Sequence, residues 1–376
     1  MLNRREFLIA GSAALGAAAA GSAFGQAAAG DDAFEFALFG DTHFDKLAHH
    51  DFDWLRREHP DSVRQVEHYS EHAASLLPEL FATVKRQLTS AGARARAVVH
   101  VGDFVEGLCG TPALAETHVR EACEAIERIE WKVPFLMTKG NHDKTGPGAD
   151  DAYAKLLHPF LGGQVGQKLT SARYAHQIGG ALFAFYDAYD KSSFDWLKET
   201  LGRNGRADRQ TFVVVHPPVV PFQARGNWSL YMREEDAARR AELLALLGEH
   251  RAIVLCGHVH RFGFVVRRTE RGPFAQLCLS SIMSAREQQP KQVLAGLDAY
   301  VPELTKLEPK FQPESVELRR KQFATEKPHI AHFEYAETAG HAMVRVDGRR
   351  VTVRIFNGTG DAAWKEIDVT QLLQAA

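Results

Sequence analysis

The sequence contains little cysteine and no excess of either charge. Its 376 residues include 4 cysteines, and 45 Lys and Arg residues stand against 47 Asp and Glu residues. A chain of this size does not need disulfide bonds to fold, so the cysteines leave the redox environment open. The net charge of -2 gives no indication of a surface for nucleic acid. Beyond residue 29 there is no internal repeat and no apolar run long enough to cross a bilayer. The function therefore has to be sought in local motifs.

The first 29 residues are predicted to be a leader that precedes the folded domain. The segment NRREFL at residues 3–8 resembles the twin-arginine export motif, and an Ala/Gly-rich stretch follows it. This stretch is too short and too weakly apolar for a membrane helix. A general secretory signal that happens to contain adjacent arginines is the alternative. We expect the precursor to use the twin-arginine export machinery, and the mature protein to be periplasmic or secreted and without a membrane anchor.

Five short apolar runs are each followed by a polar motif. The runs read FEFALF, AVVHV, PFLMT, TFVVV and AIVLC, and the motifs after them are, in order, Asp41-Thr42-His43, Gly102-Asp103, Gly140-Asn141-His142-Asp143, His216-Pro217-Pro218 and Gly257-His258-Val259-His260. Such runs are typical of strands buried on both faces of a sheet. Because ligand sites collect at the carboxyl ends of strands in α/β sheets, we expect the motifs to meet at one edge. Oxygen and imidazole donors there suit zinc, manganese or iron.

In this order, the motifs resemble the signature of the calcineurin-like metallophosphoesterase superfamily, D-x-H, G-D, G-N-H-[DE], H and G-H-x-H. The HPP and GHVH segments are most similar to the class III cyclic-nucleotide phosphodiesterase and purple-acid-phosphatase-like branches. The resemblance implies an α/β fold, a four-layer α/β-β/α sandwich of two mixed β-sheets flanked by helices.

Apolar spacing predicts helices between the strands and a change of pattern after His260. Helices are expected at residues 62–77, interrupted at Pro78, and at 112–129, 192–201 and 234–247. After His260, strands at 262–268 and 274–279 and a hairpin at 342–356 predict a second, more antiparallel sheet. We therefore expect a single domain over residues 30–376. Within it, 284–332 form a partly helical insertion and 333–376 provide strands that complete the second sheet.

The resemblance implies two metal ions, which would be divalent or trivalent Mn, Fe or Zn. One would be bound by Asp41, His43, Asp103 and His260, and the other by Asp103, Asn141, His216 and His258. The carboxylate of Asp103 would thus bridge the two ions. Residues i and i+2 of an extended segment point to the same side, so Asp41 with His43, and His258 with His260, could each face the metals together. Taken one at a time, each residue could equally be a helix cap or a hydrogen-bonded loop group.

His142 corresponds to the catalytic histidine of the superfamily. It would protonate the leaving oxygen while a metal-bridging hydroxide attacks phosphorus in line. Glu106 occupies the position, three residues after Asp103, of a carboxylate that orients this histidine in related phosphatases. Purple acid phosphatases have a metal-binding Tyr at that position, so Glu106 argues against a tyrosinate-iron chromophore.

Other histidines are not assigned to the metals. His49, His50 and His59 follow the first motif and are expected to be solvated loop residues. His100 lies inside a predicted strand, where its polar atoms are expected to be hydrogen-bonded in the core.

The loop after the fourth motif contains three candidate substrate residues, Arg225, Trp228 and Tyr231. Arg225 could pair with phosphate, and the two aromatic rings could stack on a nucleobase or an aryl leaving group. A surface loop with its own small apolar cluster is the alternative.

The leading hypothesis is a metal-dependent hydrolase of small-molecule phosphate esters, with phosphodiesters slightly favoured. A phosphomonoesterase of the same mechanism is the nearest alternative. A non-catalytic periplasmic metal-bound binding protein is the alternative from another class, and the presence of His142 with all seven ligand positions weighs against it. A protein phosphatase is disfavoured because the second motif lacks the continuation Gly-Asp-x-x-Asp-Arg.

Overall fold

The computed structural model describes residues 33–205, 208–222, 229–279, 289–301 and 313–376. The predicted leader, Arg225 and Trp228 lie outside these residues. Among the described helices, none has the length and apolar character needed to cross a membrane.

The first of two mixed sheets in the described residues contains three of the five predicted strands that precede the motifs. Its members are β1 (Phe34–Phe39), β2 (Ala95–His100), β3 (Phe135–Met137), β12 (Gly340–Asp347), β13 (Arg350–Asn357) and β14 (Ala363–Asp368). Their order across the sheet is β14-β13-β12-β1-β2-β3. The pairs β1-β2 and β2-β3 are parallel, so the carboxyl ends of these three strands lie at the same edge.

The second sheet contains the other two strands that precede motifs. Its members are β4 (Tyr174–Ile178), β5 (Ala181–Phe185), β6 (Thr211–Val214), β7 (Ile253–Cys256), β8 (Phe262–Arg267), β9 (Phe274–Cys278), β10 (Lys291–Ala295) and β11 (Ile330–Glu337). The order is β10-β11-β8-β9-β7-β6-β5-β4, and β6 and β7 are parallel neighbours.

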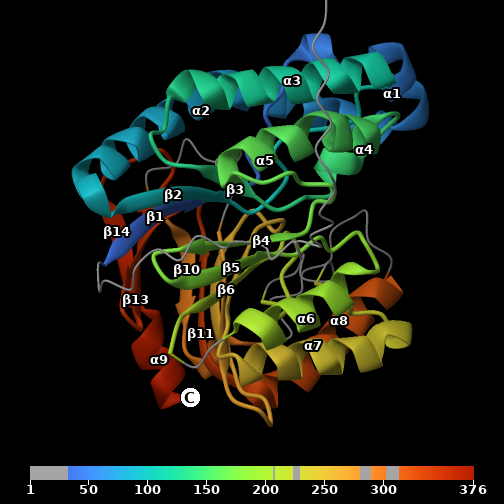
Figure 1. Ribbon diagram of the computed structural model, residues 1–376. Helices are drawn as coiled ribbons and strands as arrows, with labels where there is room; N and C mark the ends of the chain where they lie inside the picture. The colour runs from blue at the N-terminus through green and yellow to red at the C-terminus, as the bar shows by residue number, and fades with distance from the viewer. Residues whose placement is uncertain (1–32, 206–207, 223–228, 280–288, 302–312) are drawn as a thin grey trace, which may run out of the picture. The chain divides into compact units, whose positions relative to one another are not determined.

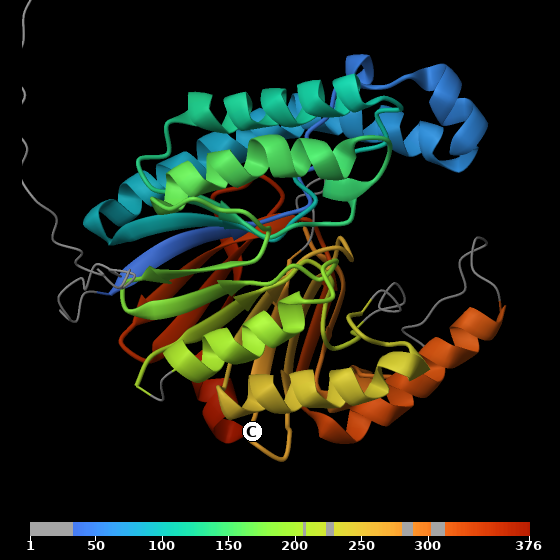
Figure 2. The ribbon, with the colours of Figure 1, turned by 45° about the vertical axis from the view of Figure 1, so that its right-hand side comes forward.

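Helices cover the outer faces of both sheets. The α-helices are α1 (Phe52–Glu58), α2 (Val63–Ala91), α3 (Pro112–Ile129), α4 (Ala149–Ala152), α5 (His158–Val165), α6 (Ser193–Asn204), α7 (Ala237–Glu249), α8 (Pro313–Glu326) and α9 (Val369–Ala375). Short 3-10 or π segments are η1 (Leu47–His49), η2 (Pro60–Ser62), η3 (Gly92–Arg94), η4 (His142–Lys144), η5 (Tyr153–Leu157), η7 (Glu234–Asp236), η9 (Leu297–Ala299) and η11 (Lys327–His329). Figures 1 and 2 show α2, α3 and α5 over the six-stranded sheet, and α6, α7 and α8 on the opposite side, against the eight-stranded sheet. The predicted four-layer sandwich is confirmed.

Aromatic side chains fill the space between the two sheets. The ring of Phe36 in β1 meets Phe183 in β5 edge-on at 5.2 Å and Phe212 in β6 edge-on at 5.5 Å. All three residues are fully buried. Edge-to-face rings add to the burial of apolar area, so these contacts hold the two sheets face to face.

The prediction that the helix at 62–77 is interrupted at Pro78 is wrong, because α2 continues through this proline to Ala91. An interior proline lacks one backbone donor and costs a helix about 3 kcal/mol or more. The helix nevertheless buries an apolar face on both sides of Pro78, including Leu77, Leu80 and Val84. Burial of that face against the sheet offsets the lost hydrogen bond.

The predicted composition of the second sheet is also wrong. The hairpin of β12 and β13 forms, but β12 pairs with β1, with Val344 opposite Phe36. β8 and β9 instead extend the sheet of β7, with Ala275 opposite Ile253. The residues after 339 therefore complete the sheet of β1, and the five motif-bearing strands are divided between two sheets. Turn and alternation signals specify neighbours along the chain, whereas the pairing of β1 with β12 depends on contacts far apart in sequence.

Candidate metal centre

All seven candidate ligands lie just beyond the carboxyl ends of parallel strands. They are Asp41 and His43 after β1, Asp103 after β2, Asn141 after β3, His216 after β6, and His258 and His260 after β7. Backbone hydrogen bonds join neighbouring loops, for example from Asp41 N to the carbonyl of Gly102 at 2.9 Å and from Gly257 N to that of His216 at 3.0 Å. The structure therefore brings the five motifs together at one place, as the sequence predicts.

One group of donor atoms comprises Asp41, His43, Asp103 and His260. Nε2 of His260 lies 3.1 Å from Nε2 of His43 and 3.4 Å from Oδ1 of Asp41. Nε2 of His43 lies 3.9 Å from Oδ2 of Asp103. In a tetrahedral site with bonds of about 2.0–2.2 Å, ligand atoms are about 3.3–3.5 Å apart. The chemistry and spacing of these donors fit a cation.

A second group comprises Asp103, His216 and His258. Nε2 of His216 lies 3.0 Å from Oδ2 of Asp103 and 3.2 Å from Nδ1 of His258. Oδ1 of Asn141 is buried and has no hydrogen-bond partner among the described residues. A buried amide oxygen without a donor is costly, and a cation would supply the missing interaction. Asp103 belongs to both groups, which is the position expected of a bridging carboxylate.

Hydrogen-bond acceptors fix the ring orientation of two candidate ligands, His43 and His216. Each acceptor lies at the ring nitrogen that faces away from the other donors. Nδ1 of His43 lies 2.7 Å from Oε2 of Glu106, and Nδ1 of His216 donates to the carbonyl of Val101 at 2.8 Å. With the proton on Nδ1, the lone pair of Nε2 faces the other donors. Metal-binding histidines commonly have such partners.

The predicted extended geometry of the Asp-x-His and His-x-His segments is wrong. Five candidate ligands have a left-handed backbone instead, with φ values of 49° at Asp41, 41° at His43, 52° at Asp103, 72° at His258 and 55° at His260. Each such residue costs about 1–3 kcal/mol and persists where the surroundings over-determine it, often at functional sites. Hydrogen bonds from His258 N to Asp41 and from His142 N to Asp103, both 2.8 Å, hold these loops.

Two motif glycines permit the close approach of the loops. A Cβ at Gly140 would collide with the backbone nitrogen and Oδ1 of Asp103, and a Cβ at Gly257 would collide with Oδ2 of Asp41. Any side chain at either position would displace a candidate ligand.

His142 lies beside the donor groups, and its ring centroid is 4.7 Å from that of His43. Its Nδ1 donates to the carbonyl of Glu106 at 2.7 Å, and its side chain retains 17% exposure, so a substrate can reach it. Burial lowers the pKa of His142, but the carboxylates of Glu106 and Asp103 outweigh it and raise the pKa to about 9. Burial raises the pKa of Glu106 to about 7, against the opposing effect of His142. Glu106 thus contacts His142 as predicted, through its carbonyl and, at 3.2 Å, its carboxylate.

Two residues beside the candidate ligands, Asp143 and Tyr69, have no role predicted from the sequence. The buried carboxylate of Asp143 accepts hydrogen bonds from Gly140 N at 2.7 Å and Phe104 N at 2.9 Å, and so joins the loops after β2 and β3. Tyr69 in α2 stacks on His43 with ring centroids 4.4 Å apart. Asp143 is the last residue of the third motif, so the sequence could have indicated that it lies at the site. No local pattern distinguishes Tyr69.

The expectation for the unassigned histidines is correct for His100 and wrong for His49 and His50, while His59 is partly buried. His100 is buried, with Nε2 3.0 Å from Oγ1 of Thr42, and its Nδ1 accepts from Gly102 N. His49 and His50 are buried rather than solvated. Their loop folds back against α3, where the His49 ring stacks on His118 at 4.3 Å.

Of the candidate substrate residues, only Tyr231 lies in the described part of the chain. It is partly buried, its hydroxyl is hydrogen-bonded to that of Tyr186, and its ring lies 6.2 Å from that of Phe194. These contacts explain its packing, and its role at the substrate stays a prediction.

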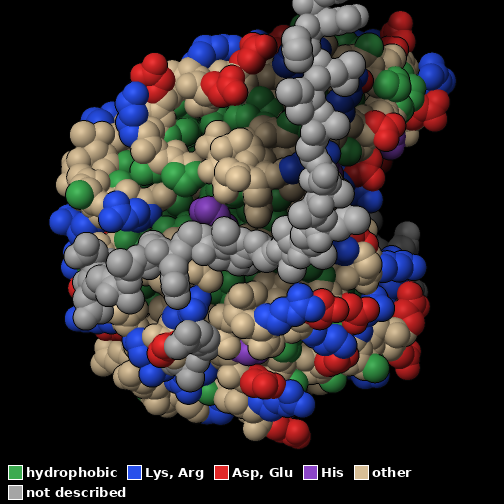
Figure 3. Space-filling model, in the orientation of Figure 1, with side chains coloured by type: hydrophobic (Ala, Val, Ile, Leu, Met, Phe, Trp, Pro, Cys, Tyr) green, Lys and Arg blue, Asp and Glu red, His purple; other side chains and the backbone are tan. Residues whose placement is uncertain are grey.

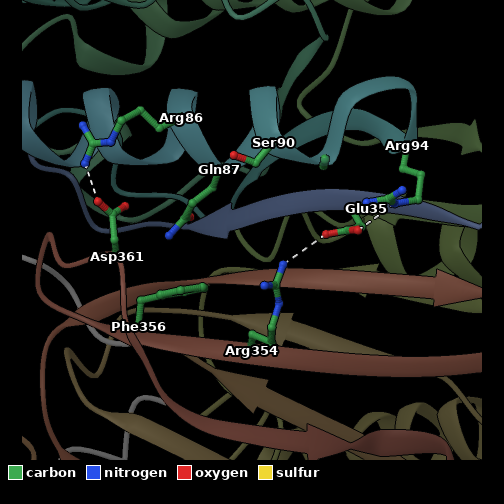
Figure 4. Close-up of a pocket in the computed structure, with 9 residues that line it drawn as sticks. Glu35, Arg86, Gln87, Ser90, Arg94, Arg354, Phe356 and Asp361 are labelled. Carbon is green, nitrogen blue, oxygen red and sulfur yellow. Dashed lines mark hydrogen bonds and ion pairs between the residues drawn. The ribbon is translucent and has the colours of Figure 1, made fainter.

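A pocket of about 460 Å³ lies away from the motifs, at the beginning of β1. Figure 4 shows its lining, in which Glu35 pairs with Arg94 at 3.0 Å and Arg354 at 3.2 Å. Arg86 in turn pairs with Asp361. Each of the three arginines of the lining is therefore paired with one of its two carboxylates. Figure 3 shows basic and acidic side chains interspersed on the face turned to the viewer in Figure 1.

A four-layer α/β sandwich that gathers carboxylate, amide and imidazole donors at its strand ends defines a class of metal-binding proteins. Residues 34–262 match the calcineurin-like phosphoesterase family. The chain belongs to this family. The family and the donor groups together support a metal-dependent phosphoester hydrolase. Comparison with curated proteins gives no significant sequence match.

Solved structures share the fold at low sequence identity. The purple acid phosphatase PPD1 from yellow lupin (Lupinus luteus) seeds has a TM-score of 0.50 and 10% identity, over 92% of this chain and 56% of the lupin chain. PhoD has a TM-score of 0.52 and 11% identity, over 89% of this chain and 68% of its own. A dimetal phosphatase from Danio rerio has a TM-score of 0.49 and 12% identity, over 89% and 98%. This chain spans little more than half the lupin enzyme, and its similarity to the lupin enzyme and PhoD is one of fold.

Proposed function

We propose that this protein hydrolyses phosphate esters with two metal ions bound to the seven candidate ligands. The observation that carries the proposal is the position of Asp103, whose Oδ2 lies 3.0 Å from His216 of one donor group and 3.9 Å from His43 of the other. Two bound cations would neutralise phosphoryl oxygens and lower the pKa of a water nucleophile. Mn, Fe and Zn all suit this ligand set.

His142 is proposed as the general acid for the leaving oxygen. The hydrogen bond from Nδ1 to the carbonyl of Glu106 leaves Nε2 available to hold the transferred proton. A pKa raised to about 9 keeps the imidazole protonated near neutral pH. General acids of this kind contribute about 10²–10⁴-fold to rates.

We propose phosphodiesters as slightly favoured substrates, because of the His216-Pro217-Pro218 and Gly257-His258-Val259-His260 segments. The test is to reconstitute metal-free protein with Mn²⁺, Zn²⁺ or Fe²⁺ and to compare kcat/KM for bis(p-nitrophenyl) phosphate and p-nitrophenyl phosphate. A higher value for the bis-ester is expected. A higher value for the monoester would make the protein a phosphomonoesterase of the same mechanism. If neither ester is hydrolysed although both metals are bound, a metal-bound binding protein is the better account.

Export through the twin-arginine machinery to the periplasm or beyond is proposed from the NRREFL segment alone. This route transports folded proteins, which suits an enzyme that binds its metals before export.

A further inference from the structure

A second buried cluster of potential metal ligands begins two residues after the first motif. Asp45, His49 and His118 offer donor atoms within 4.8 Å of one another. These residues are almost completely buried, with exposures of 2%, 1% and 1%. None of the three belongs to the candidate metal centre.

The donor atoms of this cluster are spaced like those of the candidate metal centre. Oδ1 of Asp45 lies 3.6 Å from Nδ1 of His49 and 3.4 Å from Nε2 of His118. These separations fall close to the roughly 3.3–3.5 Å between ligands of a tetrahedral zinc ion.

We propose that Asp45, His49 and His118 bind a further divalent cation. Two imidazoles and one carboxylate are a ligand set that zinc prefers. Since all three residues are buried and solvent is excluded, no position is open to a substrate, and the site is structural rather than catalytic.

The surroundings of the cluster orient its ligands. Oδ2 of Asp45 accepts from Ser70 at 2.5 Å, and Oδ1 faces Nε2 of His50 at 2.8 Å. Nε2 of His49 lies 3.1 Å from Oε2 of Glu121, and Nδ1 of His118 lies 3.2 Å from Sγ of Cys109. Each imidazole thus has a partner on the nitrogen that faces away from Asp45. Such partners orient metal-binding histidines and fix the tautomer.

The alternative is that hydrogen bonds alone hold these three residues together, with no metal ion. Nδ1 of His49 can accept from the backbone nitrogen of Lys46 at 3.2 Å, and Nε2 of His118 can donate to Phe44. The two accounts differ in one measurable quantity, the number of tightly bound metal ions.

The cation would fix the loop that presents the first motif. Asp45 follows His43 by two residues, His118 lies in α3, and Ser70 lies in α2. Figures 1 and 2 both show α2 and α3 side by side over the six-stranded sheet. The ion would therefore connect the loop to two helices. This inference does not depend on hydrolysis of any substrate.

The test is metal content after saturation with Zn²⁺ and removal of free metal, measured on the full chain by mass spectrometry. Wild type is expected to retain three equivalents and His118→Asn two. The double variant Asp103→Asn/His216→Asn, with the candidate metal centre disabled, is expected to retain one. His341→Asn is the matched control and should retain three, because His341 is equally buried and its ring nitrogens are hydrogen-bonded to Gly358 and Gln87 instead of facing a carboxylate.

Equal metal content in wild type and His118→Asn, or no metal in the double variant, would overturn the proposal in favour of the hydrogen-bonded cluster. If His118→Asn does not fold, Asp45→Asn replaces it, since the amide keeps the size of the carboxylate and loses its charge. If the binuclear centre does not form, the proposed site still gives a distinct result. Wild type and the double variant would each retain one equivalent, and His118→Asn would retain none.

Discussion

Oε2 of Glu106 lies 2.7 Å from Nδ1 of His43, and neither side chain is exposed to solvent. The same oxygen is 3.2 Å from Nδ1 of His142. One buried carboxylate therefore orients both a candidate metal ligand and the candidate acid, so metal binding and proton transfer depend on a shared residue.

Replacing Glu106 with Gln should reduce metal affinity and turnover together. His43 would lose its charged acceptor, and loss of such a partner typically costs about 10–100-fold in affinity or activity. Metal titration and kcat measured on the same preparations check this. Glu124→Gln on the exposed face of α3 is the control and should change neither quantity. Unaltered metal affinity in Glu106→Gln would show that the carboxylate does not support His43.

Asn141 and His142 are adjacent in sequence, but their substitutions should fail differently. Asn141→Ala should weaken metal binding, and excess metal should restore part of the activity. His142→Ala should keep its metals and lose about 10²–10⁴-fold in turnover. The loss should be smaller for p-nitrophenyl esters, whose leaving group needs little protonation, than for alkyl esters. Equal losses for both kinds of ester would assign His142 to phosphate binding, and loss of metal would contradict its assigned role.

The pH dependence of alkyl ester hydrolysis should show the titration of His142. The acid form is present below its pKa, raised to about 9, and is lost as the pH rises through that value. Bound cations repel the proton, so the fall should occur somewhat below pH 9 in the metal-loaded protein. A kcat profile from pH 6 to 10 checks this. The descending limb should be absent from His142→Ala, and its persistence there would assign it to another group.

Removing the ring of Phe36 should destabilise the domain without touching the candidate metal centre. Phe→Ala in a packed core costs about 3–5 kcal/mol, and this ring contacts Phe183 and Phe212 of the other sheet. Denaturant unfolding measures the loss. Phe36→Leu retains most of the volume and should lose less. A change below about 1 kcal/mol for Phe36→Ala would mean that the sheets are held together elsewhere.

Replacing Arg4 and Arg5 with lysines should trap the precursor in the cytoplasm if the twin-arginine route is used. Lysine keeps the charge but not the guanidinium geometry. Fractionation followed by immunodetection gives the distribution. A normal periplasmic yield would indicate the general secretory route.

Local signals in the sequence predicted much of the fold and of the candidate site. The five apolar runs are strands, and α3 begins at Pro112 behind Thr111, whose hydroxyl accepts from Leu114 N as a helix cap does. The donors meet because parallel strands end at a common edge. Each of these features depends on residues close together in the chain.

The features that were missed depend on contacts between distant segments. The pairing of β1 with β12 is one, and the continuation of α2 through Pro78 is another. The burial of His49 depends on α3, and the stacking of Tyr69 on His43 depends on the path of α2. Periodicity and motif spacing carry no information about such contacts.

The most direct test of the central claim is hydrolysis by metal-free protein before and after reconstitution, with Asp103→Asn treated in the same way. If hydrolysis requires the bound metals, neither p-nitrophenyl ester should be hydrolysed without metal. Activity should return with Mn²⁺, Zn²⁺ or Fe²⁺ in wild type only, and circular dichroism should show that both proteins are folded. Hydrolysis by the metal-free protein at the rate of the reconstituted one, or full recovery in Asp103→Asn, would contradict it.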